Sequence, residues 1–294
     1  MKAYQEIVQH ILKRGQWKEN RTGVRALTCA NLVFSHDMSS GFPLLTTKKM
    51  AFKTMAVELE GFIRGITSKG WFQERGCNVW AEWCNPQKIP NNCSNIKRIE
   101  LQKREDDLGP LGYSWQWRRF GEVYDEDDDG CLRGYDQLKD VVDKLNNNPN
   151  DRRMYCSAVN PLQRHKMALE PCHLIWVLTH VNGTLNLSWT QRSCDTLIGL
   201  PFNIASYALL LILLCQYGFK PGNLMGTLCD CHIYEDHIMG AEEQLSREPR
   251  ELPNISIPIS IPDNDNFDIF DWTHENLKID NYNPHSKIKF PIAV

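Results

Sequence analysis

The sequence predicts a single domain, residues 1–294, of the α/β (α+β) class, with a mixed, mostly antiparallel sheet flanked by helices. Helical and alternating β-branched segments both occur along the 294 residues. A two-residue turn joins two of the predicted strands, and regular crossover helices do not separate the strands. No internal repeat or convincing linker is visible, so we expect one domain.

The predicted helices have apolar side chains that recur every three to four residues. Gly65 ends one of them. The most apolar run, residues 207–215, is about half of the roughly 20 residues that span a bilayer, so we interpret it as a buried helix. The predicted helices cover residues 4–12, 51–64, 136–146, a long segment after Asn203 and a polar segment ending near residue 248.

The predicted strands are rich in β-branched residues and end at turn signals. Asn182-Gly183 is the dipeptide that type I′ hairpins prefer. Residues 67–107 lack periodicity and are predicted to be loop, and the acidic run 122–129 is interpreted as a solvated loop and not a metal site. The predicted strands cover residues 26–34, 154–159, 174–181, 184–191, 224–231 and a proline-interrupted edge strand over 255–261.

Composition argues against several classes of protein. Net charge is −3, and the basic pairs at residues 48–49 and 152–153 are short, which argues against a nucleic acid polymer as partner. Eleven cysteines without regular spacing are typical of reduced thiols in a cytosolic protein. The N-terminus has helical periodicity and no signal-peptide block, so we expect a cytoplasmic protein without a membrane segment. Residues 229–232 (CDCH) have too few ligands on one strand face for a metal site.

Cys172 is the candidate nucleophile. If Val181 opposes Thr184 across the predicted hairpin, Cys172 lies opposite Ser193, with Arg192 and Gln191 as neighbours. A guanidinium beside a thiol stabilises the thiolate, which is the form that attacks carbon.

A cysteine nucleophile can serve acyl transfer, redox exchange or addition to an electron-poor ring. His173 points to the opposite strand face, which argues against a simple base for Cys172, and Cys194 projects away from it, which argues against a resolving cysteine. Ring addition remains. Arg192 and Ser193 can bind phosphate, while Asn203 offers one donor and one acceptor that match an edge of uracil. These residues indicate a phosphorylated pyrimidine.

Several separated motifs run in order along nearly the whole chain. They are residues 21–23 (RTG), 41–49 (GFPLLTTKK), 109–118 (GPLGYSWQWR), 151–153 (DRR), 172–173 (CH), 191–195 (QRSCD), 199–207 (GLPFNIASY), 230–234 (DCHIY) and 292–294 (IAV). Together they resemble the thymidylate synthase family, which includes pyrimidine hydroxymethylases, and chance agreement over so many motifs is negligible.

The resemblance implies an enzyme that transfers and reduces a one-carbon unit from 5,10-methylenetetrahydrofolate to C5 of dUMP, through a Cys172 adduct at C6. It implies no metal. The implied catalytic residues are Cys172, Glu58, Tyr113, Arg192, Asp195 and Asn203. The implied dUMP-binding residues are Arg21, Arg152, Arg153, Gln191, Arg192, Ser193, Asp195, Asn203, His232 and Tyr234. The implied folate-binding residues are Glu58, Trp80, Trp83, Asp195 and Val294.

The resemblance also implies a homodimer in which Arg152 and Arg153 reach the phosphate of the second subunit. Each role has a simpler rival. The Arg pair can be a solvated face, Trp80 and Trp83 core residues, Glu58 a helix-surface acid, and Asn203 the N-cap of the helix that follows it.

Departures from the commonest family pattern keep alternatives open. Gly61 replaces a tryptophan, Glu170 precedes Pro-Cys, residues 228–229 replace two glycines, and residues 109–118 contain one extra residue. The first alternative is a dUMP 5-hydroxymethylase, in which water captures the methylene; Asn203 argues against the dCMP version. A DNA cytosine-C5 methyltransferase lacks support, because no glycine-rich cofactor loop or basic surface is visible. A non-catalytic scaffold is the third alternative.

Overall fold

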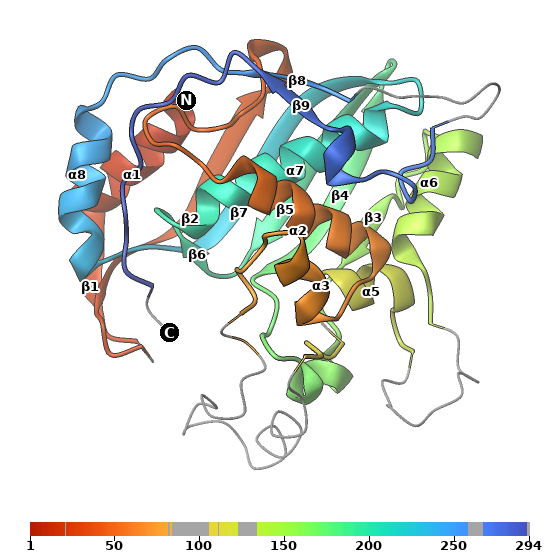
Figure 1. The fold of residues 1–294 in the computed structure, drawn as a ribbon, viewed down its shortest axis with the longest axis horizontal. Coiled ribbons are helices and arrows are strands. Elements are labelled where there is room, and N and C mark those ends of the chain that lie inside the picture. Colours follow the sequence, from red (N-terminus) through yellow and green to blue (C-terminus); the bar gives the residue numbers. More distant parts are fainter. Residues whose placement is uncertain are drawn as a thin grey trace. The chain divides into compact units, whose positions relative to one another are not determined.

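The computed structural model describes residues 1–20, 22–81, 83, 106–110, 112–122, 134–257 and 267–292 (Figure 1). The α-helices are α1 (Lys2–Arg14), α2 (Phe52–Arg64), α3 (Lys69–Glu74), α5 (Ser114–Arg119), α6 (Gln137–Asn147), α7 (Gly199–Cys215) and α8 (Ile238–Ser246). The strands are β1 (Gln16–Lys18), β2 (Ala26–Asp37), β3 (Tyr155–Ser157), β4 (His173–Val181), β5 (Thr184–Gln191), β6 (Cys194–Asp195), β7 (Lys220–Tyr234), β8 (Asn254–Ser256) and β9 (Lys278–Asp280). Short 3-10 helices are η1 (Met38–Ser40), η3 (Pro161–Lys166), η4 (Glu235–His237) and η5 (His274–Asn276).

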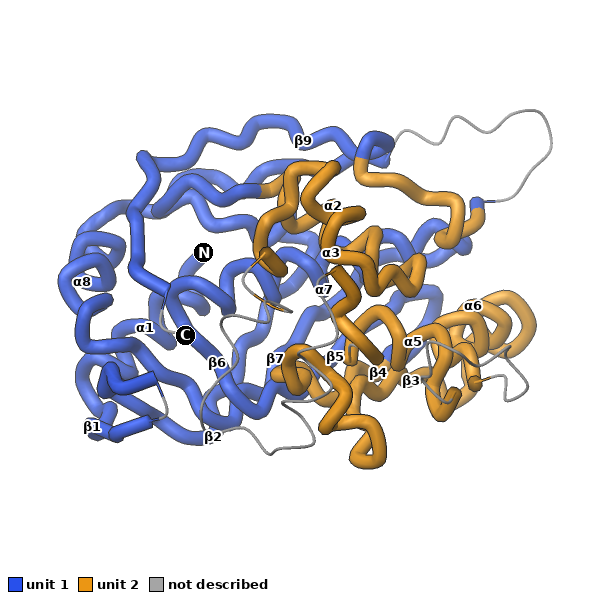
Figure 2. The backbone as a smooth tube through the Cα atoms, turned by 60° about the horizontal axis from the view of Figure 1, so that its bottom comes forward, with its two compact units in different colours: residues 1–51, 178–267, 275–294 blue, residues 52–177, 268–274 orange. Residues whose placement is uncertain are grey.

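The chain divides into two compact units, coloured separately in Figure 2. Unit 1 contains residues 1–51, 178–267 and 275–294, and unit 2 contains residues 52–177 and 268–274. Strand β4 begins in unit 2 and ends in unit 1. The single domain over residues 1–294 therefore stays a prediction.

A mixed sheet is the main architectural feature. Its strand order is β1-β2-β7-β5-β4-β3, and β6 pairs with β7 outside this path. The pairs β1–β2, β2–β7 and β3–β4 are antiparallel, whereas β5 and β6 run parallel to β7. Strands β8 and β9 form a separate antiparallel pair. The predicted mixed, mostly antiparallel sheet with flanking helices is confirmed.

The turn between β4 and β5 has the predicted chemistry. Asn182 has φ 49° and Gly183 has φ 79°. Positive φ at both central residues defines the type I′ turn, which matches the twist of the flanking strands. The Gly183 N–H also donates to the His180 imidazole at 2.8 Å, which closes the turn.

Helix α7 packs against β5, β6 and β7 in unit 1, and α1 packs against β2 and β7. Trp189 of β5 is buried and stacks on Tyr207 of α7, with ring centroids 5.0 Å apart. A Cβ added at Gly226 of β7 would lie 2.4 Å from the Trp189 ring, so glycine permits this close packing. Within the described part of the chain, no helix is long and apolar enough to cross a membrane.

The predicted start of α7 after Asn203 is wrong, because the helix begins at Gly199. Pro201 lies in the first turn, where a missing N–H costs no helical hydrogen bond. The expected loop over residues 67–107 is also wrong in part. It contains α3, whose N-cap Ser68 accepts a hydrogen bond from the Trp71 N–H at 3.2 Å.

Unit 2 has an aromatic core around Phe62 of α2. Its ring contacts the rings of Trp80, Tyr113 and Trp117, and Trp117 contacts the buried Trp176. Helices α2, α5 and α6 pack in sequence around this core, and α6 packs on β3. The core therefore brings the predicted site residues Trp80 and Tyr113 together.

Two predictions concern segments that are described only in part. The edge strand expected over residues 255–261 is short, since β8 ends at Ser256 and residues 258–266 lie outside the described part. Most of the acidic run 122–129 also lies outside it, because residues 123–133 are not described.

Candidate active site

The predicted nucleophile, Cys172, directly precedes β4 and is half-buried. Its backbone N–H donates to the Tyr113 hydroxyl oxygen at 2.7 Å, and the His173 N–H donates to the same oxygen at 3.2 Å. The Tyr113 ring lies 4.9 Å from the His173 imidazole, centroid to centroid. Two predicted site residues, 59 positions apart, are thus in direct contact.

Tyr113 stays protonated in this environment. Burial raises the pKa of its hydroxyl well above the ordinary value, and the nearby Cys172 thiol raises it further. The two backbone N–H donors oppose the shift in pKa. Because the oxygen accepts from the backbone and keeps its proton, the O–H can still donate to a bound group.

Glu58, on α2, is a buried carboxyl group of unit 2 with a shifted pKa. Burial raises its pKa from 4.5 to about 7, and the Trp80 side chain opposes this shift. The carboxyl group can therefore give or take a proton near neutral pH. The rival interpretation of Glu58 as a solvated helix-surface acid is wrong, because burial of its carboxyl group raises the pKa.

Asn203 and Gln191 form an oriented amide pair in unit 1. The Gln191 Nε2 donates to Asn203 Oδ1 at 3.0 Å and to the Ser193 carbonyl at 2.9 Å. The Trp189 Nε1 donates to Gln191 Oε1 at 3.3 Å and fixes the amide from the other side. Asn203 lies in the second turn of α7, so the rival N-cap interpretation is wrong; the N-cap is Ile198.

His232 is oriented by Asp230, two residues before it on β7. The His232 Nδ1 lies 3.0 Å from Asp230 Oδ1, and Lys18 Nζ donates to Asp230 Oδ2 at 2.7 Å. The hydrogen bond from His232, together with the Lys18 charge, lowers the pKa of Asp230 to about 2. An ionised Asp230 accepts a hydrogen bond from the Nδ1–H group, which leaves His232 Nε2 to bind a ligand. The Tyr234 ring lies 5.2 Å from the imidazole.

Asp195, on β6, pairs with His232 in parallel register. Its Oδ1 accepts the N–H groups of Leu197 and Ile198, each at 3.0 Å, and so shapes the loop before α7. Tyr4 of α1 supports this loop, because its hydroxyl donates to the Thr196 carbonyl at 3.0 Å.

Sequence reasoning missed Asp230 and Tyr4 as supports. A period-two signal could have found Asp230, since residues 230 and 232 share one strand face. No local signal links Tyr4 to Thr196, which is 192 residues away.

The remaining predicted residues are less constrained by contacts. Trp80 is buried beside Phe62, which agrees with the core interpretation, and Trp83 is half-buried. Arg152 and Arg153 are exposed, and Arg153 pairs with Asp151 at 2.7 Å, as expected of a solvated face in the single chain.

The predicted residues divide between the two units. The contact of Cys172 with Ser193 and Arg192 across the hairpin stays a prediction, because Cys172 belongs to unit 2 and the other two to unit 1. Arg21 and Val294 lie outside the described residues, so their roles also stay predictions. Unit 2 holds Glu58, Trp80, Trp83, Tyr113, Arg152, Arg153 and Cys172, and unit 1 holds Gln191, Arg192, Ser193, Asp195, Asn203, His232 and Tyr234.

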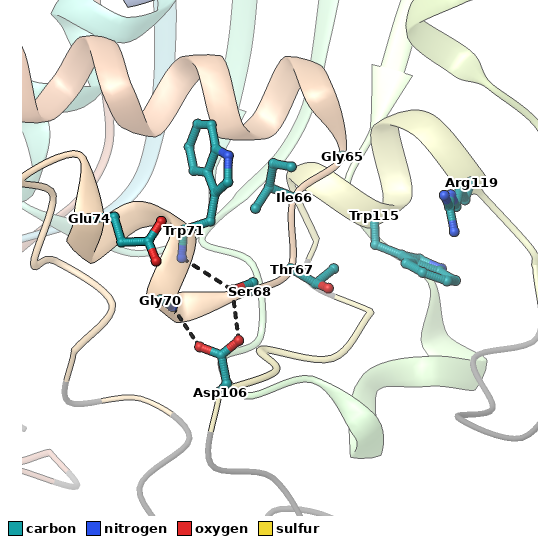
Figure 3. Close-up of a pocket in the computed structure, with 10 residues that line it drawn as sticks. All are labelled: Gly65, Ile66, Thr67, Ser68, Gly70, Trp71, Glu74, Asp106, Trp115 and Arg119. Atoms are coloured by element: carbon teal, nitrogen blue, oxygen red, sulfur yellow. Dashed lines mark hydrogen bonds between the residues drawn. The ribbon is translucent and has the colours of Figure 1, made fainter.

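Unit 2 also has a surface pocket of about 600 Å³ (Figure 3). Asp106 organises its wall by accepting from the Ser68 hydroxyl at 2.7 Å and from the Gly70 N–H at 2.6 Å. The predicted site residues are not among its lining residues, which include Trp71, Trp115 and Arg119. Among the described residues, no group of three or more His, Cys, Asp or Glu side chains is placed to hold a metal ion.

Comparison with known proteins agrees with the motifs. The family model described as thymidylate synthase matches residues 2–294, which spans both units. A match over nearly the entire chain cannot come from one shared motif, and it includes the segments around Cys172, Asn203 and His232. The chain belongs to the thymidylate synthase family.

Proposed function

We propose that this protein transfers and reduces a one-carbon unit from 5,10-methylenetetrahydrofolate to C5 of dUMP, giving dTMP and dihydrofolate. The family assignment supports methylation of dUMP in general. The observation that carries the finer proposal is the Tyr113 hydroxyl bound to the backbone of Cys172, in the same unit as Glu58 with its pKa raised to about 7. A nucleophile beside groups that keep or exchange protons at neutral pH suits addition to a ring.

In the proposed reaction, the Cys172 thiolate forms a bond to C6 of the uracil, and C5 becomes an enolate carbon. That carbon attacks the methylene group of the folate. Glu58, acting through water, assists removal of the C5 proton as the carbon–nitrogen bond to the folate breaks. Hydride transfer from the folate then reduces the methylene to methyl and oxidises the folate to dihydrofolate, and the sulfur–carbon bond breaks to release dTMP.

The proposed binding roles follow the contacts in each unit. Asn203 Oδ1 has a second lone pair beyond the one used by Gln191, so the amide can still accept from uracil and donate to it. His232 Nε2 and Tyr234 are proposed to bind the sugar hydroxyl. The proposed phosphate ligands are Arg21, Arg192, Ser193 and, from the other subunit, Arg152 and Arg153. The proposed folate contacts are Trp80, Trp83, Asp195 and Val294.

The homodimer in this proposal is supported by one sheet face of unit 1. Residues on β2, β5 and β7 that pair with one another present uncharged side chains there, and Val33 and Met225 are 57% and 40% exposed. An uncharged sheet face with exposed apolar side chains is typical of a protein interface. The face consists of Val33, Ser35, Ser188, Thr190, Met225 and Thr227. A cytoplasmic location, expected from the thiol cysteines, is part of the same proposal.

Mixing two inactive variants tests the dimer. Cys172→Ala chains and Arg152→Ala/Arg153→Ala chains are refolded together, and dTMP formation is measured. Shared sites should restore about a quarter of wild-type activity if chains mix at random and form two-fold pairs. Sedimentation as a monomer, or no restored activity in a demonstrated mixed dimer, would contradict the shared site.

A dUMP 5-hydroxymethylase is the competing function, because Gly61 stands where the family commonly has tryptophan. The Phe72 ring, which is fully buried, occupies that space, and a Cβ at Gly61 would lie 2.2 Å from it. Phe72 therefore closes the gap that the missing side chain would leave for water. This packing supports hydride capture over capture by water.

Incubation with dUMP and methylenetetrahydrofolate separates the two functions. The mass of the nucleotide product distinguishes a methyl group from a hydroxymethyl group, and absorbance follows dihydrofolate. We expect methyl product in step with dihydrofolate. Hydroxymethyl product without dihydrofolate would replace the proposal with its competitor.

A further inference from the structure

The C-terminal segment of unit 1 is held against α8 through the ring of Phe290. A Cβ added at Gly240 of α8 would lie 2.5 Å from Phe290 Cε1 and 3.2 Å from two further ring atoms. Real Cβ atoms do not approach this closely, so glycine at 240 allows the ring to lie on the backbone of α8. The pairing of a glycine with a large ring fixes where this segment meets the helix.

His237, at the end of η4, holds the next residue of the segment. Its side chain is fully buried, and Nε2 lies 2.7 Å from the Pro291 carbonyl oxygen. A carbonyl can only accept, so the proton is on Nε2. The imidazole centroid is also 5.1 Å from that of Phe290. Ile292, the last described residue, is 73% exposed.

Lys48 connects the same ring to the loop before α7. Its ammonium lies 4.7 Å from the Phe290 ring centroid and donates to the Leu197 carbonyl, while the Leu197 N–H donates to Asp195 Oδ1 at 3.0 Å. Lys48 is only 6% exposed, so its cation–π contact is desolvated and therefore stronger than one on the surface. All of these residues belong to unit 1.

We propose that Phe290, His237, Gly240 and Lys48 form a C-terminal latch, which fixes the C-terminal segment at Phe290 and Pro291 and couples it to the loop that carries Asp195. These four are positioning residues and not catalytic ones. The latch rests on the proposed function, because that function assigns Asp195 and Val294 as contacts of the folate. The latch predicts that positioning of the C-terminal segment affects use of folate more than use of dUMP.

Hydrogen exchange tests the latch without turnover. Deuterium uptake is measured by mass spectrometry for peptides covering residues 286–294 and 194–199 in the wild type, Phe290→Ala and Gly240→Ala. We expect uptake in the C-terminal peptide to be about tenfold faster in both variants, and uptake in the Asp195 peptide to rise as well. Met239→Ala, an 83% exposed neighbour on α8, is the matched control and should not change either peptide. Unchanged uptake in both variants overturns the latch.

A double-mutant cycle tests the contact itself. Gly240→Ala harms the latch through the Phe290 ring, so it should add nothing once the ring is removed. The double variant Gly240→Ala/Phe290→Ala is expected to match Phe290→Ala in exchange rate. Additive effects would show that alanine at 240 acts elsewhere and would overturn the assignment.

Kinetics test the coupling to folate. Phe290→Ala should raise KM for methylenetetrahydrofolate about tenfold and leave KM for dUMP within about twofold. His237→Phe should also raise KM for methylenetetrahydrofolate. His237→Gln, which retains an N–H donor, should keep this KM close to the wild-type value. Equal changes in both KM values would overturn the coupling. Exchange results that support the latch in a protein that makes no dTMP would instead reject the proposed function alone.

Discussion

The two units hold their predicted site residues by different means. In unit 2, burial raises the pKa values of Glu58 and Tyr113, and the Tyr113 oxygen binds the backbone at Cys172. In unit 1, polar side chains orient one another, as in the pairs Gln191–Asn203 and Asp230–His232, and the pKa of Asp230 falls to about 2. Unit 2 therefore holds groups whose pKa values are raised by burial. Unit 1 instead holds side chains whose orientation is fixed by hydrogen bonds, together with a carboxylate that is ionised.

This difference predicts a kinetic division. Variants of Cys172, Tyr113 and Glu58 in unit 2 should mainly lower kcat, because they change bond formation and proton transfer. Variants of the oriented pairs in unit 1 should mainly raise KM for dUMP, because they change how the nucleotide is held. The division is wrong if these unit 2 variants mainly raise KM for dUMP, or if variants of the oriented pairs in unit 1 mainly lower kcat.

Removing the sulfur has the largest expected effect. Cys172→Ala should lower kcat by at least about 10³-fold, since no other group replaces a lost nucleophile. Steady-state dTMP formation measures this change. Cys229→Ser, which alters a half-buried thiol in unit 1, is the matched control and should retain activity. Comparable activity of Cys172→Ala and the wild type would refute covalent catalysis.

Replacing the carboxyl group of Glu58 is expected to come next. Glu58→Gln should lower kcat by about 10² to 10⁴-fold, the usual contribution of a positioned acid–base group. It should also remove from the pH–kcat profile any limb with an apparent pKa near 7. An unchanged profile would assign the proton transfer to another group.

Stability against pH gives Glu58 a second test. Its folded pKa of about 7 exceeds the ordinary 4.5, so the native state favours the protonated form. That stabilisation is complete below about pH 4.5 and is lost as the pH rises through 7. Glu58→Gln cannot ionise, so its melting temperature should exceed that of the wild type at pH 8 by a margin that shrinks toward pH 5. A margin independent of pH would contradict the raised pKa.

Removing the Tyr113 hydroxyl has an intermediate expected effect. Tyr113→Phe removes the hydroxyl oxygen that accepts from the Cys172 and His173 N–H groups, which should cost about 1–3 kcal/mol of the free energy of unfolding. It should lower kcat by tens of fold, with a small change in KM for dUMP. Urea unfolding and steady-state kinetics measure both. Tyr155→Phe, at an exposed hydroxyl in unit 2, is the control, and an equal loss there would remove the special role of Tyr113.

The smallest expected effect is at Asp230. Asp230→Asn removes the carboxylate that fixes the His232 tautomer and should raise KM for dUMP about tenfold, with kcat within about twofold. Lys18→Met keeps the His232 contact and should have a weaker effect. Because the pKa of Asp230 is lowered to about 2, its contribution to stability persists above about pH 4 and is lost as the pH falls through 2. A larger effect on kcat than on KM would place His232 in the chemical step.

The sequence predicted features that depend on local chemistry. The Asn182-Gly183 turn and the bounds of β5 follow from positive-φ preferences and side-chain alternation, and the structure confirms both. The six residues of α3 are too few to show helical periodicity. Pro201 does not decide where the next helix begins, because proline suits both the segment before a helix and its first turn.

The sequence predicts which residues form the candidate site, but it says less about the contacts that hold them in place. The motifs around Cys172 and Asn203 point to the residues, because the chemistry requires those types. The hydrogen bond from the Cys172 N–H to Tyr113 joins positions 59 residues apart. The hydrogen bond from Gln191 to Asn203 depends on how α7 packs against β5. Local spacing cannot predict such contacts, since they arise only when the core forms.

Covalent attachment to Cys172 is the most direct test of the account. The protein is incubated with 5-fluoro-dUMP and methylenetetrahydrofolate, digested, and its peptides are mapped by mass spectrometry. The account predicts that the peptide containing Cys172 carries both the nucleotide and the folate. Absence of any adduct in a folded protein, or an adduct on a different cysteine, would contradict it.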